Sequence, residues 1–133
     1  MSKELKADFI TEAGYRAVVL LVHNSHHCGY VGIPKEHPLF DKGYSEGEYP
    51  NTPEGMFAVH GGITYSGGHH GYPIADDKEL WWLGFDCAHL GDATLGKHSF
   101  NEEYAVFRDV PYVTAECEKL ALQLKEYSDK ANP

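Results

Sequence analysis

Two stretches of the sequence carry ionisable side chains at positions where a plain strand would carry valine or threonine. The first stretch reads VHGGITYSGGHHGYP and the second reads WWLGFDCAHLGD. Histidine and aspartate at such positions can act as general acids and bases, as metal ligands, or as the polar groups of a binding site. Which chemistry applies depends on whether the two stretches bring these side chains to one place.

Both stretches are predicted to form strands, over residues 56–65 and 80–89, and side chains alternate between the two faces of a strand. Each predicted strand has one apolar face, which is expected to pack against the apolar stripe of the C-terminal helix. These apolar faces carry Phe57, Val59, Ile63 and Tyr65 in the first strand and Trp81, Leu83, Phe85 and Cys87 in the second. The opposite faces carry small residues together with His60 and Thr64, and with Trp82 and Asp86.

If the two strands pair, the second face becomes a concave, glycine-lined pocket for a flat, polar small molecule, because glycine in a strand leaves room for close approach. Aromatic rings would stack on such a ligand. The predicted ligand-binding residues are His60, Thr64, Tyr65, Trp82, Asp86, His89 and Asp92. An equally weighted alternative is that His60 and Asp86 only bond to each other on the solvated face of an antiparallel sheet.

A metal site is the next alternative, because the chain contains nine histidines. Zinc or another divalent cation could be held in a metal-dependent hydrolase by His60, Asp86, His89 and Asp92. Their spacing contains neither a CxxC pair nor an HExxH motif. The leading prediction is therefore a ligand site that holds no metal or other cofactor.

Nucleophilic chemistry has less support from the sequence. Cys87 falls on an apolar face, where a thiol is unreactive, and Cys117 falls on the apolar stripe of a predicted helix. Cys28 lies in a histidine-rich turn and is expected to be the more exposed thiol. The chain contains no GxSxG elbow, no P-loop and no GxGxxG fingerprint.

The bulk composition limits the classes of partner. The 133 residues suit a single domain over 1–133, and 11 basic against 20 acidic residues give a net charge of −9. This sign disfavours nucleic acid and anionic membranes as partners. A host protein that binds an acidic surface is a third candidate function, and a second copy of the chain is a candidate partner. The N-terminal MSKELKADF lacks the apolar core of a signal peptide, so a cytoplasmic location is expected.

The elements that would position the site form an α+β fold: a mainly antiparallel sheet of four or five strands with a C-terminal amphipathic helix packed on one face. The helix is predicted to begin at a capping Asp109. Its apolar stripe consists of Val113, Cys117, Leu120, Ala121 and Leu124. Residues 15–23 and the following YVGIP predict a hairpin.

Three further segments complete the prediction. Residues 2–13 are predicted to form a short helix closed by Gly14, with an extended strand as the alternative. Residues 34–55, rich in proline and glycine, form a long loop of the kind that often has a binding role. Residues 104–108 are predicted to form a short edge strand.

The motifs VHGGITYSG and WWLGFDCAHLGD, together with CGYVGIPKEHPLF and YVTAECEKLALQL, resemble a family of small proteins encoded by bacteriophages and prophages. This resemblance covers most of the chain from about Cys28 onward. It implies expression in the cytoplasm of an infected bacterial cell, and it carries no assigned activity. By analogy with other small phage proteins, the leading functional prediction is an accessory protein that binds a small polar, nucleotide-derived ligand in a sequestering or counter-defence role.

Overall fold

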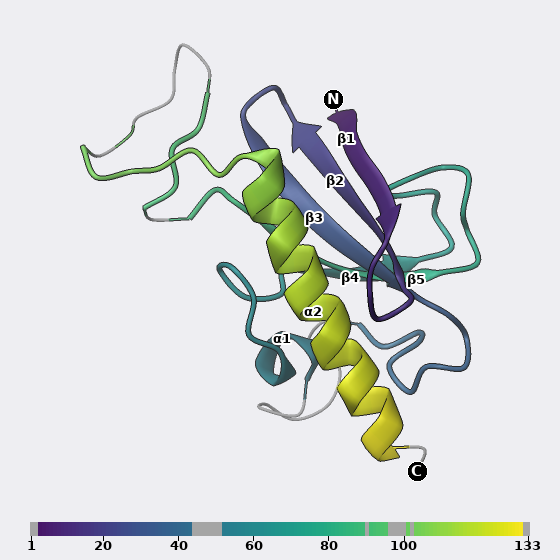
Figure 1. Ribbon diagram of the computed structural model, residues 1–133. Coiled ribbons are helices and arrows are strands. Elements are labelled where there is room, and N and C mark those ends of the chain that lie inside the picture. Colours follow the sequence, from purple (N-terminus) through teal and green to yellow (C-terminus); the bar gives the residue numbers. More distant parts are fainter. Residues whose placement is uncertain (1–2, 44–51, 90, 96–100, 102, 132–133) are drawn as a thin grey trace.

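Five antiparallel strands form one sheet in the order β1-β2-β3-β5-β4, and a long C-terminal helix crosses one face of this sheet (Figure 1). The computed structural model describes residues 3–43, 52–89, 91–95, 101 and 103–131. The elements are β1 (Lys3–Ile10), β2 (Arg16–Val22), β3 (His26–Ile33), α1 (Pro53–Met56), β4 (Tyr65–Gly68), β5 (Trp81–Asp86) and α2 (Val110–Ala131). This architecture confirms the predicted α+β class.

The helix α2 forms as its sequence predicts. Asp109 caps its first turn, because its carboxylate accepts the backbone N–H of Tyr112 at 3.0 Å. The residues that α2 buries are Val113, Cys117, Leu120, Ala121 and Leu124. On the sheet side they pack against Leu83, Phe85 and Cys87, whose side chains lie on the helix-facing side of β5 and just after it. The predicted pairing of these two apolar surfaces is therefore confirmed.

The opposite face of the sheet is a second apolar core, which corrects the prediction of an open, polar face. This second core consists of Val18, Leu20, Val22, Cys28, Tyr30 and Trp82, and it is covered by Tyr65, Tyr72, Ile74 and Leu80. The sequence RAVVLLV explains why, because consecutive residues of β2 point to opposite faces and nearly all of them are apolar. Both faces of the sheet must therefore be covered from water.

The N-terminal segment forms a strand, so the predicted helix over residues 2–13 is wrong and the extended alternative is correct. β1 pairs with β2 along its length, from Lys3 opposite Val22 to Ile10 opposite Arg16. Gly14 lies in the turn between these strands with a φ of +99°, a conformation that favours glycine. The pairing with β2 outweighs a weak helical pattern. The hairpin predicted next in the chain is confirmed as β2 and β3.

The predicted strand over residues 56–65 is also wrong. Met56 ends α1 and residues 57–64 are irregular. β4 begins only at Tyr65, the last residue of the predicted strand, and continues to Gly68. Gly61 and Gly62 have φ values of +68° and +83°, which no strand adopts. The Gly62 N–H bonds to the Val59 carbonyl at 2.8 Å and closes a turn. The strand predicted over 80–89 is confirmed only for its central part, β5.

Two more predictions need revision at the level of single segments. In place of an edge strand at 104–108, the structure has a parallel bridge between Asp92 and Val106. The predicted long loop over 34–55 contains α1, and its residues 44–51 lie outside the described part of the chain.

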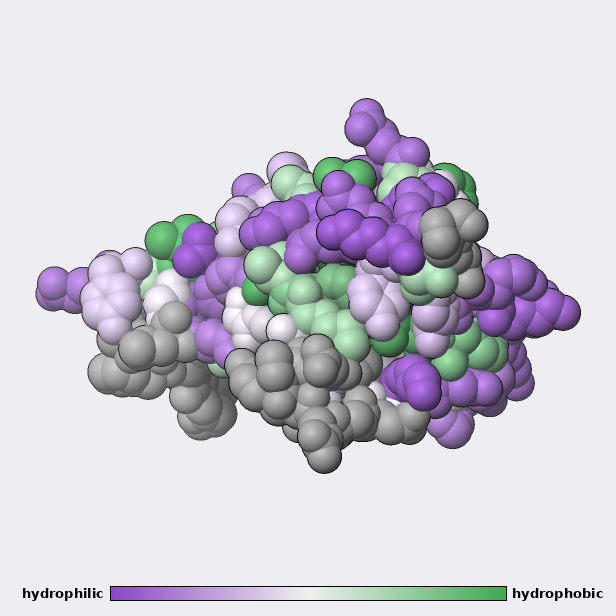
Figure 2. Space-filling view, turned by 90° about the horizontal axis from the view of Figure 1, so that it is seen from below, coloured by the Kyte–Doolittle hydropathy of each residue, from purple (hydrophilic) through white to green (hydrophobic). Residues whose placement is uncertain are grey.

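Among the described residues, no helix has the length and apolar character needed to span a bilayer. In Figure 2 hydrophilic residues border a paler, more hydrophobic area on the face that is seen from below.

Candidate functional site

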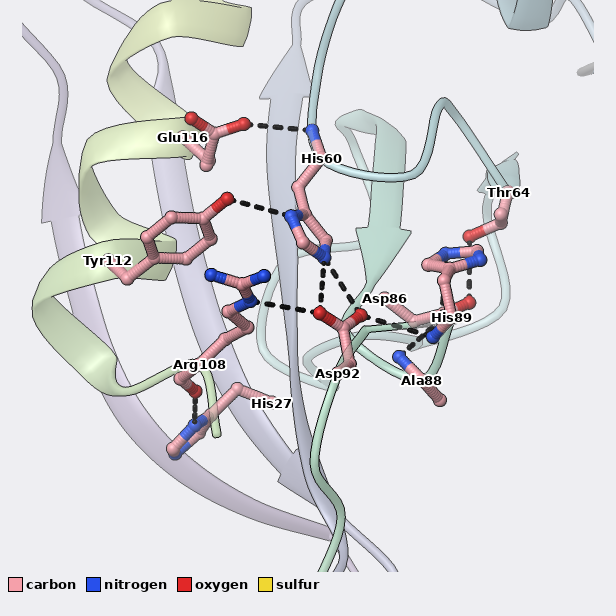
Figure 3. A network of polar contacts seen from close by, with 10 residues as sticks. All are labelled: His27, His60, Thr64, Asp86, Ala88, His89, Asp92, Arg108, Tyr112 and Glu116. Carbon is pink, nitrogen blue, oxygen red and sulfur yellow. Dashed lines mark hydrogen bonds and ion pairs between the residues drawn. The ribbon is translucent and has the colours of Figure 1, made fainter. Parts of the chain in front are cut away.

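The predicted ligand-binding residues lie in three separate places. His60 and Asp92 meet in a hydrogen-bonded network at the N-terminal end of α2 (Figure 3). Thr64, Asp86 and His89 lie beside this network. Tyr65 and Trp82 pack in or against the second core on the other face of the sheet. The structure therefore brings together part of the predicted set, and it does so on the helix side rather than on the predicted face.

His60 is the centre of the network, which also includes two residues that the sequence analysis missed. Its Nε2 lies 2.9 and 2.8 Å from the two carboxylate oxygens of Asp92, and its Nδ1 lies 2.7 Å from the Tyr112 hydroxyl. Arg108 donates from Nε to Asp92 Oδ1 at 2.9 Å. The side chain of Asp92 is 1% exposed and that of His60 is 13% exposed, so the contact between them is nearly dry.

The protonation of this network follows from its geometry. Burial raises the pKa of the Asp92 carboxyl, but hydrogen bonds from His60, Arg108 and the His89 backbone outweigh burial and hold this pKa below its usual range. Asp92 is therefore ionised at neutral pH and can only accept hydrogen bonds. His60 Nε2 therefore donates to Asp92, and in that tautomer Nδ1 accepts the hydrogen bond from the Tyr112 hydroxyl.

Local backbone structure positions His60 between the sheet and α2. The backbone N–H of His60 donates to Glu116 Oε1 at 2.8 Å, which ties the 57–64 segment to the helix. The next residue, Gly61, has a φ of +68°, and a Cβ at this position would collide with the ring of His89. Glycine is therefore required at position 61 by both its conformation and its neighbour. No pattern in the sequence alone connects Glu116 with His60.

Arg108 is placed by the segment that precedes α2. Its backbone carbonyl accepts a hydrogen bond from Nδ1 of the buried His27 at 2.7 Å. The parallel bridge between Asp92 and Val106 fixes the same segment beside the 91–95 loop. The sequence patterns assigned no role to Arg108. Tyr112 was concealed within the helical pattern, although it lies one turn after the capping Asp109.

Asp86 belongs to a more exposed group next to the network. Its Oδ2 accepts the Thr64 hydroxyl at 3.2 Å, and its Oδ1 accepts the Ala88 backbone N–H at 3.1 Å. His89 Nε2 lies 3.1 Å from Asp86 Oδ1, at an angle unsuited to a hydrogen bond. The predicted direct bond between His60 and Asp86 is replaced by the bond between His60 and Asp92.

The alternative of a metal site at His60, Asp86, His89 and Asp92 finds no support in the geometry. Within the described part of the chain, no three His, Cys, Asp or Glu side chains are grouped so that they could hold a metal ion. Asp92 shows the reason, because both of its carboxylate oxygens already accept hydrogen bonds and one of these bonds comes from Arg108. A cation at this position would have to displace Arg108.

Trp82 and Tyr65 cannot serve the predicted pocket. Trp82 is 1% exposed, and Tyr65 packs edge-on against Tyr30 at 5.7 Å between ring centroids. Tyr65 was expected on the helix-facing side and lies on the opposite one, because the irregular 57–64 segment changes the alternation. Both residues stabilise the second core.

All three thiols are buried, which corrects the expectation that Cys28 is exposed. Burial raises the pKa of Cys28, Cys87 and Cys117 to about 12 in each case. The thiolate is the nucleophilic form, and a thiol with this pKa holds its proton at neutral pH. The prediction that Cys87 is unreactive agrees with its burial.

A cavity that the sequence analysis did not assemble lies at the opposite end of β3 and β5. The network lies at the end where Cys28 pairs with Asp86, whereas the cavity lies at the end where Ile33 pairs with Trp81. The cavity has a volume of about 510 Å³. It is lined by Pro34, Lys35, Glu36, Phe40, His69, Lys78, Glu79 and Leu80.

The cavity combines aromatic rings with charged side chains. His69 packs edge-on against Phe40 at 5.7 Å, and its Nε2 lies 2.7 Å from Asp41 Oδ1, which fixes the ring. None of the ion pairs between described residues uses Lys35 or Lys78. The long loop over 34–55 and the HH pair of SGGHHGYP were the available signals, but nothing in the sequence shows that they meet.

Comparison of the chain with protein families, with curated proteins and with solved structures found no match. The resemblance to the phage-encoded family therefore remains a prediction from the motifs, and the function must be argued from the geometry of the chain itself.

Proposed function

We propose that this protein binds a small, polar, anionic ligand with a flat ring, of the nucleotide-derived class, in the cavity beside Phe40 and His69. The observation that carries this proposal is a single cavity lined by aromatic rings and by two lysines that form no ion pair among the described residues. A volume of about 510 Å³ falls in the range of small-molecule sites, about 300–1,000 Å³. The ligand site thus differs from the one predicted around His60.

The two kinds of lining residue account for the two parts of the proposed ligand. Phe40 and His69 offer ring surfaces for stacking, which tolerates any flat heterocycle. Lys35 and Lys78 are point charges that suit phosphate or carboxylate groups. The carboxylates of Glu36 and Glu79 can accept hydrogen bonds from amino groups on the ring of the ligand. None of the ion pairs between described residues uses Lys35 or Lys78, so both ammonium groups are available to an anionic part of the ligand.

In an infected bacterial cell, which is the setting that the resemblance implies, such binding would sequester a host nucleotide. The cavity lies apart from the His60 network, so the proposal requires retention of the ligand and no reaction. This distinguishes it from the hydrolase alternative, which requires a product.

The test is a fluorescence titration, because Trp81 is a built-in reporter of the cavity. Its ring lies 6.1 Å from that of Phe40 and 5.8 Å from that of His69, whereas Trp82 is buried in the second core. Adenosine monophosphate should change the Trp81 emission in a saturable way. Adenosine and inorganic phosphate should each bind more weakly, because each lacks one part of the ligand.

The matched control uses a second cavity of the same volume. This control cavity, also about 510 Å³, is lined by Glu12, Ala13, Glu118, Lys119, Leu122 and Lys125 and has no aromatic side chain. Lys78→Ala should weaken binding of adenosine monophosphate about tenfold, equal to about 1.4 kcal/mol. Lys125→Ala should leave binding unchanged. Equal affinity in the two variants, or no saturable change in the wild-type protein, would contradict the proposal.

A further inference from the structure

The His60 network is not used by the ligand site, and it ends at a hydroxyl group. Tyr112, His60 and Asp92 form a continuous chain of hydrogen bonds, with 2.7 Å from the hydroxyl to Nδ1 and 2.8 Å from Nε2 to the nearer carboxylate oxygen. Enzymes activate a nucleophile by such an arrangement, in which a hydroxyl lies within hydrogen-bond reach of a base and an acid orients that base. In this chain the position of the nucleophile is taken by a tyrosine.

Asp92, the buried end of this series of hydrogen bonds, fixes the direction of proton transfer. Asp92 holds the Nε2 proton of His60, so the Nδ1 lone pair faces the Tyr112 hydroxyl. Burial and the charge of Glu116 raise the pKa of Tyr112. The hydroxyl therefore keeps its proton at neutral pH and reacts only when a base removes it. His60 is positioned as that base, and Asp92 stabilises the imidazolium that forms.

The orientation of Tyr112 is fixed before any substrate arrives. Its ring meets that of His60 at 90° with 5.3 Å between centroids. Its backbone lies in the first turn of α2, where Asp109 accepts its N–H. Figure 3 shows the Tyr112 hydroxyl directed at His60. A nucleophile held in this way needs little reorganisation to react.

Arg108 supplies a positive group beside the hydroxyl. Its guanidinium carbon lies 5.0 Å from the centre of the Tyr112 ring, and its Nε is used by Asp92. The hydrogen bonds between described residues leave its two terminal nitrogens unpaired, and in Figure 3 these lie on the side that faces Tyr112 and His60. A guanidinium presents its donors in a planar fork that matches the oxygens of a phosphate.

We propose that Tyr112 is a nucleophile toward phosphate esters, activated by His60 and Asp92 and assisted by Arg108. In the step, a bond forms from Tyr112 Oη to phosphorus while the bond from phosphorus to the leaving oxygen breaks. The hydroxyl proton passes to His60 Nδ1. The leaving oxygen departs with the electron pair of the broken bond and takes this proton from the imidazolium or from water. The product is a phosphotyrosine on Tyr112.

The experiment uses para-nitrophenyl phosphate as the probe, with release of nitrophenolate and the mass of the intact chain as the readouts. The folded protein should release about one equivalent of nitrophenolate in a burst and gain a phosphoryl group, which peptide mapping should place on Tyr112. Tyr112→Phe should abolish both. Tyr104→Phe is the matched control, because Tyr104 is 63% exposed and lies outside the network.

His60→Gln tests the role of the base, since the glutamine amide can still contact Asp92 but cannot accept a proton. The burst should be about a hundredfold slower or more in this variant, which is the usual effect of losing a general base. A thermal melt establishes that each variant is folded. Absence of label on Tyr112 in the folded wild-type protein, or an unchanged burst rate in folded His60→Gln, would overturn the proposal. Binding of adenosine monophosphate at the cavity is measured separately, so the two proposals can fail independently.

Discussion

The His60 network and the cavity beside Phe40 lie at opposite ends of the same strand pair and differ in how their charges are satisfied. In the network, the Asp92 carboxylate is 1% exposed, and both of its oxygens accept hydrogen bonds from protein groups. In the cavity, Lys35 and Lys78 take part in none of the ion pairs between described residues. The buried carboxylate of the network is fully paired within the protein, whereas the two lysines of the cavity are available to a ligand.

This difference separates two kinds of contribution to the free energy. Paired groups that are buried stabilise the fold, because removing one partner leaves the others without a hydrogen bond away from water. Unpaired groups on a cavity wall contribute little to stability and are free to contribute to binding. Variants in the network should therefore lower stability and leave ligand affinity at the cavity unchanged. Variants in the cavity should lower ligand affinity and leave stability unchanged.

The largest expected effect is on the network. Asp92→Ala should lower the free energy of unfolding by about 2–3 kcal/mol, because His60 Nε2, Arg108 Nε and the His89 N–H all lose their acceptor. Chemical denaturation measures this loss. Asp86→Ala is the matched control, since the Asp86 side chain is 31% exposed and solvent can replace its partners. An equal loss in the two variants would remove the distinction between a dry network and a solvated one.

Acidification provides the second test of the network. The pKa of Asp92 lies below its unfolded value of about 3.9, so its contribution is complete above that value and is lost as the pH falls through the lower, folded pKa. The free energy of unfolding should therefore fall more steeply between about pH 5 and pH 2 in the wild-type protein than in Asp92→Asn. Asp8, whose pKa is lowered by its hydrogen bond to Arg16, contributes equally to both proteins. Parallel pH profiles would mean that Asp92 is not preferentially ionised in the folded state.

A smaller effect is expected at the open end of the network. Tyr112→Phe removes one hydrogen bond to His60 and keeps the ring, so the free energy of unfolding should fall by about 1 kcal/mol. The midpoint of urea unfolding at constant slope is the appropriate measurement. A loss as large as that of Asp92→Ala would show that the tyrosine, and not the aspartate, holds the network together.

The smallest effect is expected in the cavity. The double variant Lys35→Ala and Lys78→Ala should keep the free energy of unfolding within about 0.5 kcal/mol of the wild type, as surface substitutions usually do. A loss of stability comparable to that of the network variants would mean that these lysines have structural partners, and the comparison between the two regions would fail.

Local sequence patterns were sufficient to predict α2, the β2–β3 hairpin and the central part of β5. In α2 the apolar residues recur at helical spacing after a capping Asp109, and in β2 the run AVVLLV requires burial. These signals depend on residues that are near one another in the chain. The α+β class follows from them, because an apolar helix stripe and an apolar strand must cover each other.

The site itself was decided by tertiary structure. The sequence identified His60 and Asp92 as polar residues with a shared role, but it placed His60 on the wrong face, because Gly61 and Gly62 end the alternation that a strand would have kept. Arg108 is 16 residues from its partner Asp92, Tyr112 is 52 residues from its partner His60, and the cavity joins the 34–40 segment to residues 69 and 78 in the same way. Such long-range contacts arise from packing of the whole chain, and no local spacing encodes them. The sequence alone therefore determined which segments must be buried, and the folded structure determined which polar groups meet.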